Sequence, residues 1–177
     1  MREPNGSRSR MNLFKELTWK TVLPFIGIAL PVLALDWVSK WLIQLHIPHG
    51  FGYPVIPGFF NLRHDRNSGA AFGVLAGQRT FLILVTFVAF VFIFIYFLKF
   101  RNSRWMQIAS GFLLGGAIGN FIDRIRSGQV VDFLQFGIES QGLFWPTFNV
   151  ADVSVCIGAG MLIVYLFRNR HRHDANL

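Results

Sequence analysis

Long uncharged stretches alternate with polar segments along the chain and predict four membrane-spanning helices. The clearest is residues 80–98, which carry no charged side chain over 19 positions. A helix needs about 20 apolar residues to cross a bilayer core. Residues 105–122 and 150–167 are two more such stretches, with a few polar side chains near their ends. The first stretch, residues 21–35, is long enough only if its helix continues to about residue 42. Bulky and charged residues follow it, which favours a retained helix over a cleaved signal peptide.

The segments between the helices on one side of the membrane have a different pattern. Residues 43–79 contain short apolar runs separated by Gly and Pro, which is typical of strands and turns. In the second outer segment we expect a hairpin, with strands at residues 129–136 and 143–148 around a turn at 139–142. The predicted fold is therefore an α-helical integral membrane protein with four transmembrane helices and a small β part on one side.

The charge of the chain indicates how it lies in the membrane. The sequence holds 17 Lys and Arg against 9 Asp and Glu, a net charge of +8. The termini and the loop at 99–104 carry 11 of the basic residues and three acidic ones, while the opposite side carries six of each. The positive-inside rule places the termini in the cytoplasm. We expect one domain over residues 1–177, with 1–20 and 169–177 as cytoplasmic ends. Charge distributed in this way does not indicate a nucleic-acid partner.

Composition excludes several other classes of protein. Hydrophobic residues make up 53% of the chain and charged residues 15%, against about 25% charged residues in a typical soluble domain. This is too hydrophobic for a disordered chain and too poor in charge for a soluble one. Cys156 is the single cysteine, so no disulfide can form within the chain. We expect its thiol to be buried within the fourth helix and unreactive.

Acidic side chains gather at the outer ends of the predicted helices, where an ionisable group is costly and indicates function. Two close carboxylates share a proton, so one acts as an acid while the other acts as a base. Such a pair can activate water and protonate a leaving amine, which hydrolyses a peptide bond. Spacing alone leaves open whether Asp123 or Asp132 partners Asp152. The polar residues expected at this level are Asp36, Asn67, Asn120, Asp123, Asp132, Asn149 and Asp152.

Two other functions compete with this hypothesis. Asp123, Asp132 and Asp152 could hold magnesium in a lipid enzyme, although acids of that kind group on adjacent helical turns. A proton-coupled transporter would place acids deep within several helices, whereas these lie at or beyond the helix ends. No nucleotide-binding glycine loop occurs, and the outer histidines lack zinc-type spacing. We therefore expect no metal and no cofactor.

Four blocks of sequence, in order, resemble a known family. They read DWVSK at 36–40, RNSGAAFG at 66–73, GGAIGNFIDR at 115–124 continuing to GQVVDF at 128–133, and FNVAD at 148–152. Together they resemble the lipoprotein signal peptidases, the bacterial signal peptidase II family, over residues 20–168. The departures are Trp37, where Gln is common, and Asp65, where an apolar residue is common. Neither departure falls on an expected catalytic position.

The resemblance implies an aspartyl endopeptidase with four membrane helices and an outer β-sheet cradle. It implies a bacterial inner-membrane enzyme that cuts diacylglyceryl-prolipoproteins on the N-terminal side of the lipid-modified cysteine. Membrane lipids are its other partners, and we expect a monomer. Asp132 and Asp152 match the catalytic dyad of the family. The matching positions for substrate binding or support are Asp36, Lys40, Asn67, Gly69, Asn120, Asp123, Arg124, Asn149 and Ala151.

Several of these residues also have purely structural interpretations. Asn149 with Asp152 three residues later is typical of a helix N-cap and an acid in the first turn. Asp123 and Arg124 are expected to form an ion pair rather than to act in the chemistry, and Asn120 to brace the carboxylates.

Three further patterns are expected to be structural. Asp36 and Lys40 lie one helical turn apart and can form an ion pair. Gly111, Gly115 and Gly119 recur at the spacing that lets membrane helices approach closely. The turn at residues 67–69 is a hairpin signal.

Overall fold

The computed structural model describes residues 18–70 and 74–174 of the chain. Within them, four helices are long and apolar enough to cross a membrane. They are α1 (Trp19–His46), α2 (Arg79–Lys99), α3 (Arg104–Ser127) and α4 (Val150–Asp174). Each covers a predicted span, and α1 continues through Asp36 and Lys40 as its length required. The four predicted helices are therefore confirmed.

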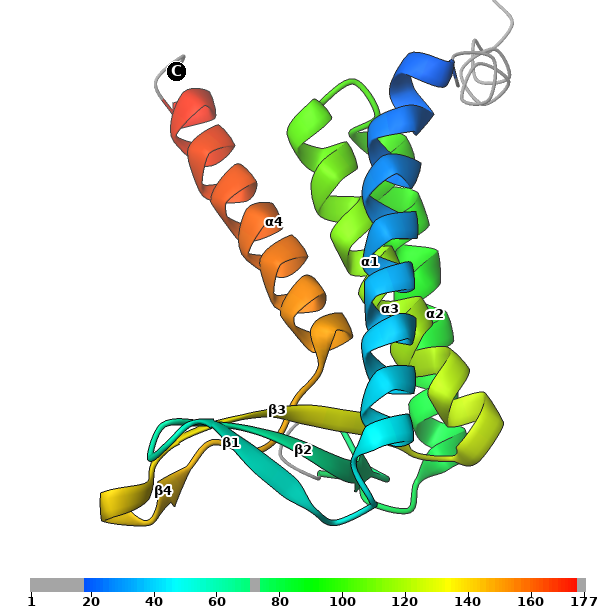
Figure 1. Ribbon diagram of the computed structural model, residues 1–177. Coiled ribbons are helices and arrows are strands. Elements are labelled where there is room, and N and C mark those ends of the chain that lie inside the picture. The colour runs from blue at the N-terminus through cyan, green and yellow to red at the C-terminus, as the bar shows by residue number, and fades with distance from the viewer. Residues whose placement is uncertain (1–17, 71–73, 175–177) are drawn as a thin grey trace, which may run out of the picture.

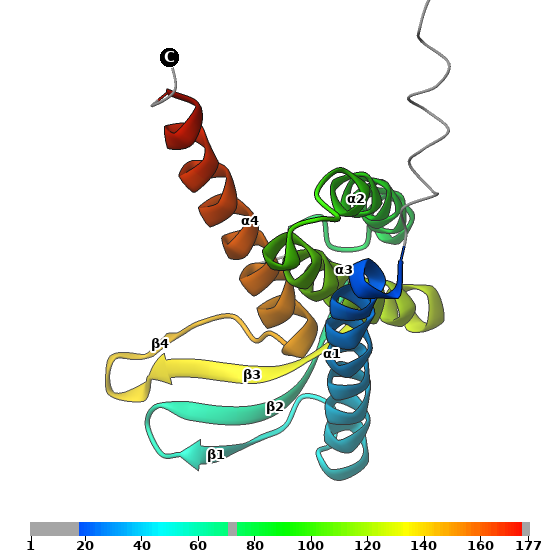
Figure 2. The same cartoon turned by 90° about the horizontal axis from the view of Figure 1, so that it is seen from above.

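Helix α3 occupies the centre of the bundle and contacts each of the other three helices (Figure 2). Its glycines allow this. A Cβ on Gly111 would lie 2.7 Å from the carbonyl oxygen of Phe25, and one on Gly115 would lie 2.8 Å from that of Ala29. The predicted packing role is confirmed for this face. Sequence analysis did not identify a second close contact of this helix, in which Gly116 lies against the Ala151 carbonyl of α4.

A four-stranded antiparallel sheet lies across the ends of the helices opposite the start of α1 and extends to one side beneath α4 (Figure 1). Its strands are β1 (Gly52–Ile56), β2 (Phe60–Asn67), β3 (Val130–Ile138) and β4 (Leu143–Phe144), in that spatial order. The strand β3 and the turn after it match the predicted hairpin. The sheet is held to the bundle by an apolar cluster of Ile43 from α1 and Ile47 directly after it with Val131 and Phe133 from β3.

Two details of the predicted β part are wrong. The strand expected at 143–148 is only two residues long. Pro146 has no N–H to donate, so the chain leaves the sheet there and returns only as a bridge between Phe148 and Leu134. The turn at 67–69 ends β2 but joins no hairpin, since β2 pairs with the distant β3.

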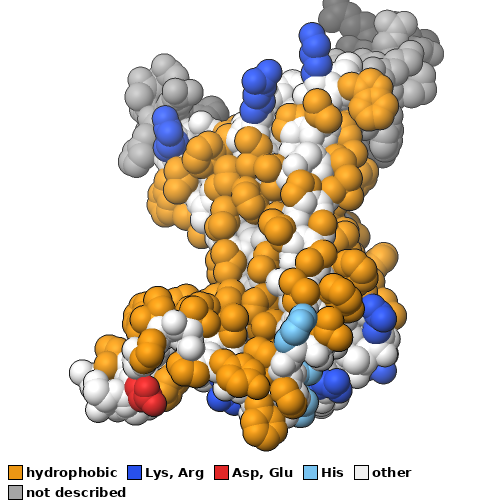
Figure 3. Space-filling model, viewed as in Figure 1, with side chains coloured by type: hydrophobic (Ala, Val, Ile, Leu, Met, Phe, Trp, Pro, Cys, Tyr) orange, Lys and Arg blue, Asp and Glu red, His pale blue; other side chains and the backbone are white. Residues whose placement is uncertain are grey.

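The surface of the helices is mainly apolar (Figure 3). Exposed phenylalanine and leucine side chains such as Phe81, Leu84 and Phe87 cover α2, as expected for a helix in contact with lipid. Cys156 is exposed on α4, so the prediction of a buried thiol is wrong. The start of α1 and the end of α4 lie at the same end of the bundle (Figure 1).

Candidate active site

Polar side chains from three helices and two strands meet at the end of the bundle that carries the sheet, where an otherwise apolar protein buries several carboxylates. Asp36 of α1 and Asp132 of β3 are 1% and 2% exposed, and Asp152 at the start of α4 is partly buried. All the site residues named from the sequence lie in this region or directly beside it. Most of them belong to one of two networks of ion pairs and hydrogen bonds.

The first network surrounds Lys40, whose side chain is 3% exposed. Its ammonium forms ion pairs with Asp36 Oδ2 at 2.7 Å and Asp123 Oδ2 at 2.8 Å. It also donates a hydrogen bond to Asn120 Oδ1 at 2.9 Å. Three oxygen atoms therefore surround the ammonium and offset the cost of burying a cation. The predicted Asp36–Lys40 pair is confirmed.

Asp123 lies within α3 and not in a loop after it, which corrects the expected end of that helix. Its ion pair is with Lys40, so the expected pair with Arg124 is wrong. Consecutive residues on a helix point about 100° apart, and Arg124 turns instead toward the chain after β2. There it donates to the carbonyl oxygen of Gly69 at 3.0 Å.

The same network attaches the start of α4. Asp36 Oδ1 accepts a hydrogen bond from the backbone N–H of Ala151 at 2.9 Å, and Ala151 is completely buried. Gly119 faces this contact, since a Cβ there would collide with the Asp36 carboxylate. Asp36 thus satisfies one of the free N–H groups at the helix start and fixes where the helix begins.

The second network contains Asp132 and Asp152. Asn149 caps α4, with Oδ1 accepting from the Asp152 N–H at 3.0 Å and its own N–H donating to Asp152 Oδ2 at 3.2 Å. This reciprocal cap confirms the predicted N-cap. Asp152 Oδ1 accepts a further hydrogen bond from Asn120 Nδ2 at 2.8 Å. The carboxylate is therefore held in place by N–H donors at a helix N-terminus.

Asp132 is held by two amides. Asn149 Nδ2 donates to Oδ1 at 2.7 Å, and Asn67 Nδ2 donates to Oδ2 at 3.1 Å. Burial, and after it the neighbouring Asp152 charge, raise the pKa of Asp132 to about 7, while the two amides and the Lys40 charge oppose the rise. Within the described residues, no ion pair joins Asp132 or Asp152 to a cation. These two carboxylates therefore differ from Asp36 and Asp123, which share Lys40.

Asn120 connects the two networks, and Lys40 sets its orientation. Because an ammonium has only donors, it must face the amide oxygen of Asn120. The amide NH₂ is then turned toward Asp152. Asn149 Nδ2 also donates to Asn120 Oδ1, at 3.2 Å. The bracing role predicted for Asn120 is therefore present in the contacts.

The sheet supplies Asn67 through an irregularity that sequence reasoning missed. The register of β2 and β3 shifts between Leu62 and Asp65, after which Asp65 lies opposite Asp132 and Asn67 opposite Val130. A bulge of this kind changes which side chains share a face. Asn67 is further held by its own turn, where its Oδ1 accepts from the Gly69 N–H at 2.8 Å.

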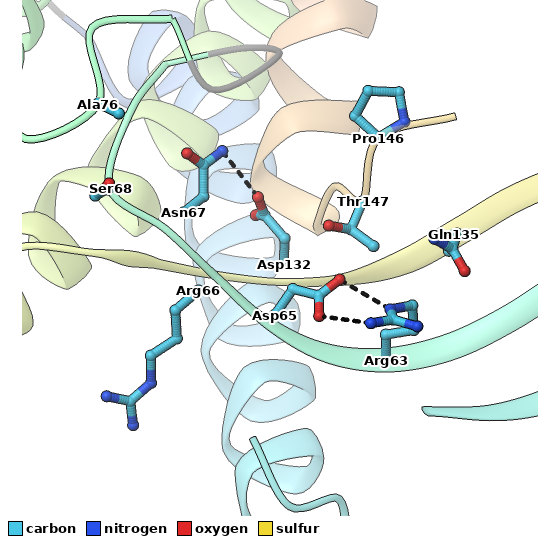
Figure 4. Close-up of a pocket in the computed structure, with 10 residues that line it drawn as sticks. All are labelled: Arg63, Asp65, Arg66, Asn67, Ser68, Ala76, Asp132, Gln135, Pro146 and Thr147. Atoms are coloured by element: carbon cyan, nitrogen blue, oxygen red, sulfur yellow. Dashed lines mark hydrogen bonds and ion pairs between the residues drawn. The ribbon is translucent and has the colours of Figure 1, made fainter. Parts of the chain in front are cut away.

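A cavity of about 560 Å³ opens beside Asp132 and Asn67 (Figure 4). Sequence analysis did not identify its polar wall, which includes Arg63, Asp65, Gln135 and Thr147. The signal available was Asp65, the departure from the family pattern. Among the residues that the structure describes, no three His, Cys, Asp or Glu side chains are grouped so as to hold a metal ion.

The chain resembles known proteins in its sequence and its fold. The family model of signal peptidase II matches residues 28–168. The lipoprotein signal peptidase of Halothermothrix orenii is 43% identical over 83% of this chain and 97% of its own. That of Staphylococcus aureus is 39% identical over 82% of this chain and 91% of its own. A bacterial membrane enzyme solved at 2.3 Å shares 36% identity with a TM-score of 0.75, over 87% of this chain and 91% of its own.

Proposed function

The chain belongs to the signal peptidase II family, and we propose that it works as an aspartyl endopeptidase with Asp132 and Asp152 as its catalytic pair. The observation that carries this proposal is the contrast in charge compensation. Both carboxylates are held by Asn149, yet in the part of the chain that the structure describes neither forms an ion pair with a cation. Two such groups favour a state that shares one proton.

The environments of the two carboxylates assign their roles. Asp132, with its pKa raised to about 7, carries the proton. Asp152, held at the helix N-terminus by N–H donors on both oxygens, acts as the base. Asp152 takes a proton from water as the water oxygen bonds to the scissile carbonyl carbon. Asp132 gives its proton to the carbonyl oxygen, forming a neutral tetrahedral diol.

Collapse of this intermediate completes the reaction. The proton held by Asp152 passes to the amide nitrogen as the carbon–nitrogen bond breaks, and the diol hydroxyl returns its proton to Asp132. The products are a carboxylic acid and a free amine, and both carboxyl groups regain their starting states. Asn67, Asn120 and Asn149 keep the pair oriented throughout, which contributes more to the rate than binding alone.

The position of the site suggests the substrate. The site lies beside the sheet, at the end of the bundle opposite the start of α1 and the end of α4 (Figure 1). The distribution of Lys and Arg supports a cytoplasmic location for the chain ends and hence a site at the outer face. A prolipoprotein, whose signal helix and diacylglyceryl group stay in the bilayer, can reach it sideways. The cut then falls on the N-terminal side of the lipid-modified cysteine, at the membrane surface.

Cleavage of a diacylglyceryl-modified prolipoprotein by the purified full chain in detergent tests the proposal. The unmodified protein should cut it, and Asp132→Asn and Asp152→Asn should each reduce the rate about 10⁴-fold. Glu139→Gln is the matched control, since it removes an exposed outer carboxylate far from the pair. Unchanged folding of each variant is checked by circular dichroism. Full activity in either dyad variant overturns the assignment.

A further inference from the structure

The proposed chemistry leaves unused an ion pair on the wall of the cavity beside Asp132. Arg63 Nε lies 3.0 Å from Asp65 Oδ2, and Nη2 lies 3.2 Å from Oδ1, so the two planar groups meet through two hydrogen bonds. Their side chains are 33% and 27% exposed, open to a ligand in the cavity. The hydrogen bond to Asp65 raises the pKa of Arg63, so the guanidinium stays charged.

This pair is placed to contact a substrate. Asp65 lies directly across the sheet from Asp132, and opposite residues on neighbouring antiparallel strands share a face. Figure 4 shows the Arg63–Asp65 pair farther along β2 than Asn67, next to Gln135 and Thr147. A polypeptide bound at Asp132 can therefore continue across this wall.

The polarity of the cavity wall suits only one part of the proposed substrate. Its wall is mostly polar, whereas the second cavity of the sheet, about 360 Å³, is lined by Phe59, Phe136, Phe144 and other apolar residues. Acyl chains and the apolar signal helix gain nothing from a wall of ions and amides. The remaining part is the water-soluble polypeptide that begins after the modified cysteine.

We propose that this cavity is a specificity subsite for the residue following the modified cysteine, and that the Arg63–Asp65 pair selects a neutral, hydrogen-bonding side chain there. The inference rests on the proposed function and deepens it. A neutral polar side chain meets a wall of zero net charge. Within the described residues the hydrogen bonds of Arg63 use Nε and Nη2, which leaves Nη1 to donate to it.

Other side chains are disfavoured for identifiable reasons. An apolar side chain would cover the ion pair and leave the free N–H groups without a partner. An acidic side chain would be repelled by Asp65, and a basic one by Arg63. Because each partner screens the other, breaking the pair should turn this neutral preference into a charge preference of predictable sign.

The test compares kcat/KM for four diacylglyceryl-modified substrates that carry Ser, Leu, Asp or Lys after the cysteine. The unmodified protein should prefer Ser over each of the others by roughly tenfold. Asp65→Asn should shift the Asp-to-Lys ratio toward Asp by about tenfold, and Arg63→Gln should shift it toward Lys by a similar factor. The double variant Arg63→Gln/Asp65→Asn should bring the ratio back to that of the unmodified protein.

Arg126→Gln is the matched control. It removes a positive charge from an exposed side chain in the last turn of α3, which does not line the cavity. Its ranking of the four substrates should equal that of the unmodified protein. The inference is overturned if both single variants keep that ranking, or if they shift it in the same direction. Absence of cutting in all four substrates would instead overturn the proposed function, so the two failures are distinguishable.

Discussion

Two pairs of carboxylates lie at the end of the bundle that carries the sheet, and their surroundings differ. Asp36 and Asp123 share the buried ammonium of Lys40 at 2.7 and 2.8 Å. Among the residues that the structure describes, Asp132 and Asp152 are held by amide and backbone N–H donors. The first pair is compensated by a full charge, and the second is held in place by dipoles that leave its proton free to move.

The difference shows how one cluster serves both structure and chemistry. A buried ion pair costs several kcal/mol to break when one partner is lost, so the Lys40 network is suited to joining α1, α3 and α4. A carboxylate paired with lysine would be a poor proton donor. Amides orient the second pair and oppose the rise in the pKa of Asp132 only in part. Asn120 connects the first network to the second.

The most direct test of this difference is to neutralise one carboxylate of each pair. Asp132→Asn should lower cleavage about 10⁴-fold while leaving the protein as stable as before, or more stable above pH 7. Asp36→Asn should instead destabilise the fold, because Lys40 loses a partner. Activity assays with thermal unfolding in detergent measure both. Equal losses of stability in the two variants would remove the distinction between the networks.

Lys40 is the next target, because both of its carboxylates depend on it. Lys40→Met should cost about 3–5 kcal/mol of stability by leaving two buried carboxylates without a cation. Lys20→Met is the control, since Lys20 is exposed on the same helix. Denaturant titration of the two variants gives the measurement. A Lys40→Met protein as stable as the control would show that the ammonium is not structural.

Asn120 tests whether the networks are coupled. Asn120→Ala removes the donor to Asp152 and should lower kcat by about 100-fold through misplacement of that carboxylate. Its effect on KM should be small, because the site surface near the substrate is retained. Asn61→Ala, which removes an amide pair on the sheet, is the control and should keep kcat. A change confined to KM would contradict the positioning role.

The pH dependence follows from Asp132. Its folded pKa of about 7 lies above the value of about 3.9 in an unfolded chain. The folded state therefore binds more protons between these values, so its stabilising contribution is complete below about pH 4 and is lost as pH rises through 7. Cleavage should fall over the same upper range as Asp132 loses its proton. Between pH 5 and 8, the free energy of unfolding should change less with pH in Asp132→Asn than in the unmodified protein. An unchanged pH dependence would exclude Asp132 as the cause.

The smallest effect is expected far from both networks. Cys156→Ala changes an exposed side chain on a membrane helix, so cleavage and stability should stay close to those of the unmodified protein. A folded but inactive variant would show a role for the thiol that the contacts do not suggest.

Local features were predictable because they depend on residues close in the chain. Helix spans follow from runs of apolar residues, and the Asp36–Lys40 pair follows from one helical turn. The Asn149–Asp152 cap likewise joins residues three positions apart. The predicted burial of Cys156 was wrong because the hydrophobic periodicity along a membrane helix is weak. A residue that faces lipid then resembles one that faces the core.

The sequence by itself determined the four helices, the uneven charge at the two ends and the set of polar residues that could meet between them. Its spacing left Asp123 and Asp132 as equal partners for Asp152, and the resemblance to a family favoured Asp132. Only the tertiary structure joins Asp123 to Lys40 and Asp132 to Asn149. The reason is physical, because such partners depend on how helices rotate against one another and on a register shift between β2 and β3. Those are properties of packing between distant segments, which no local pattern encodes.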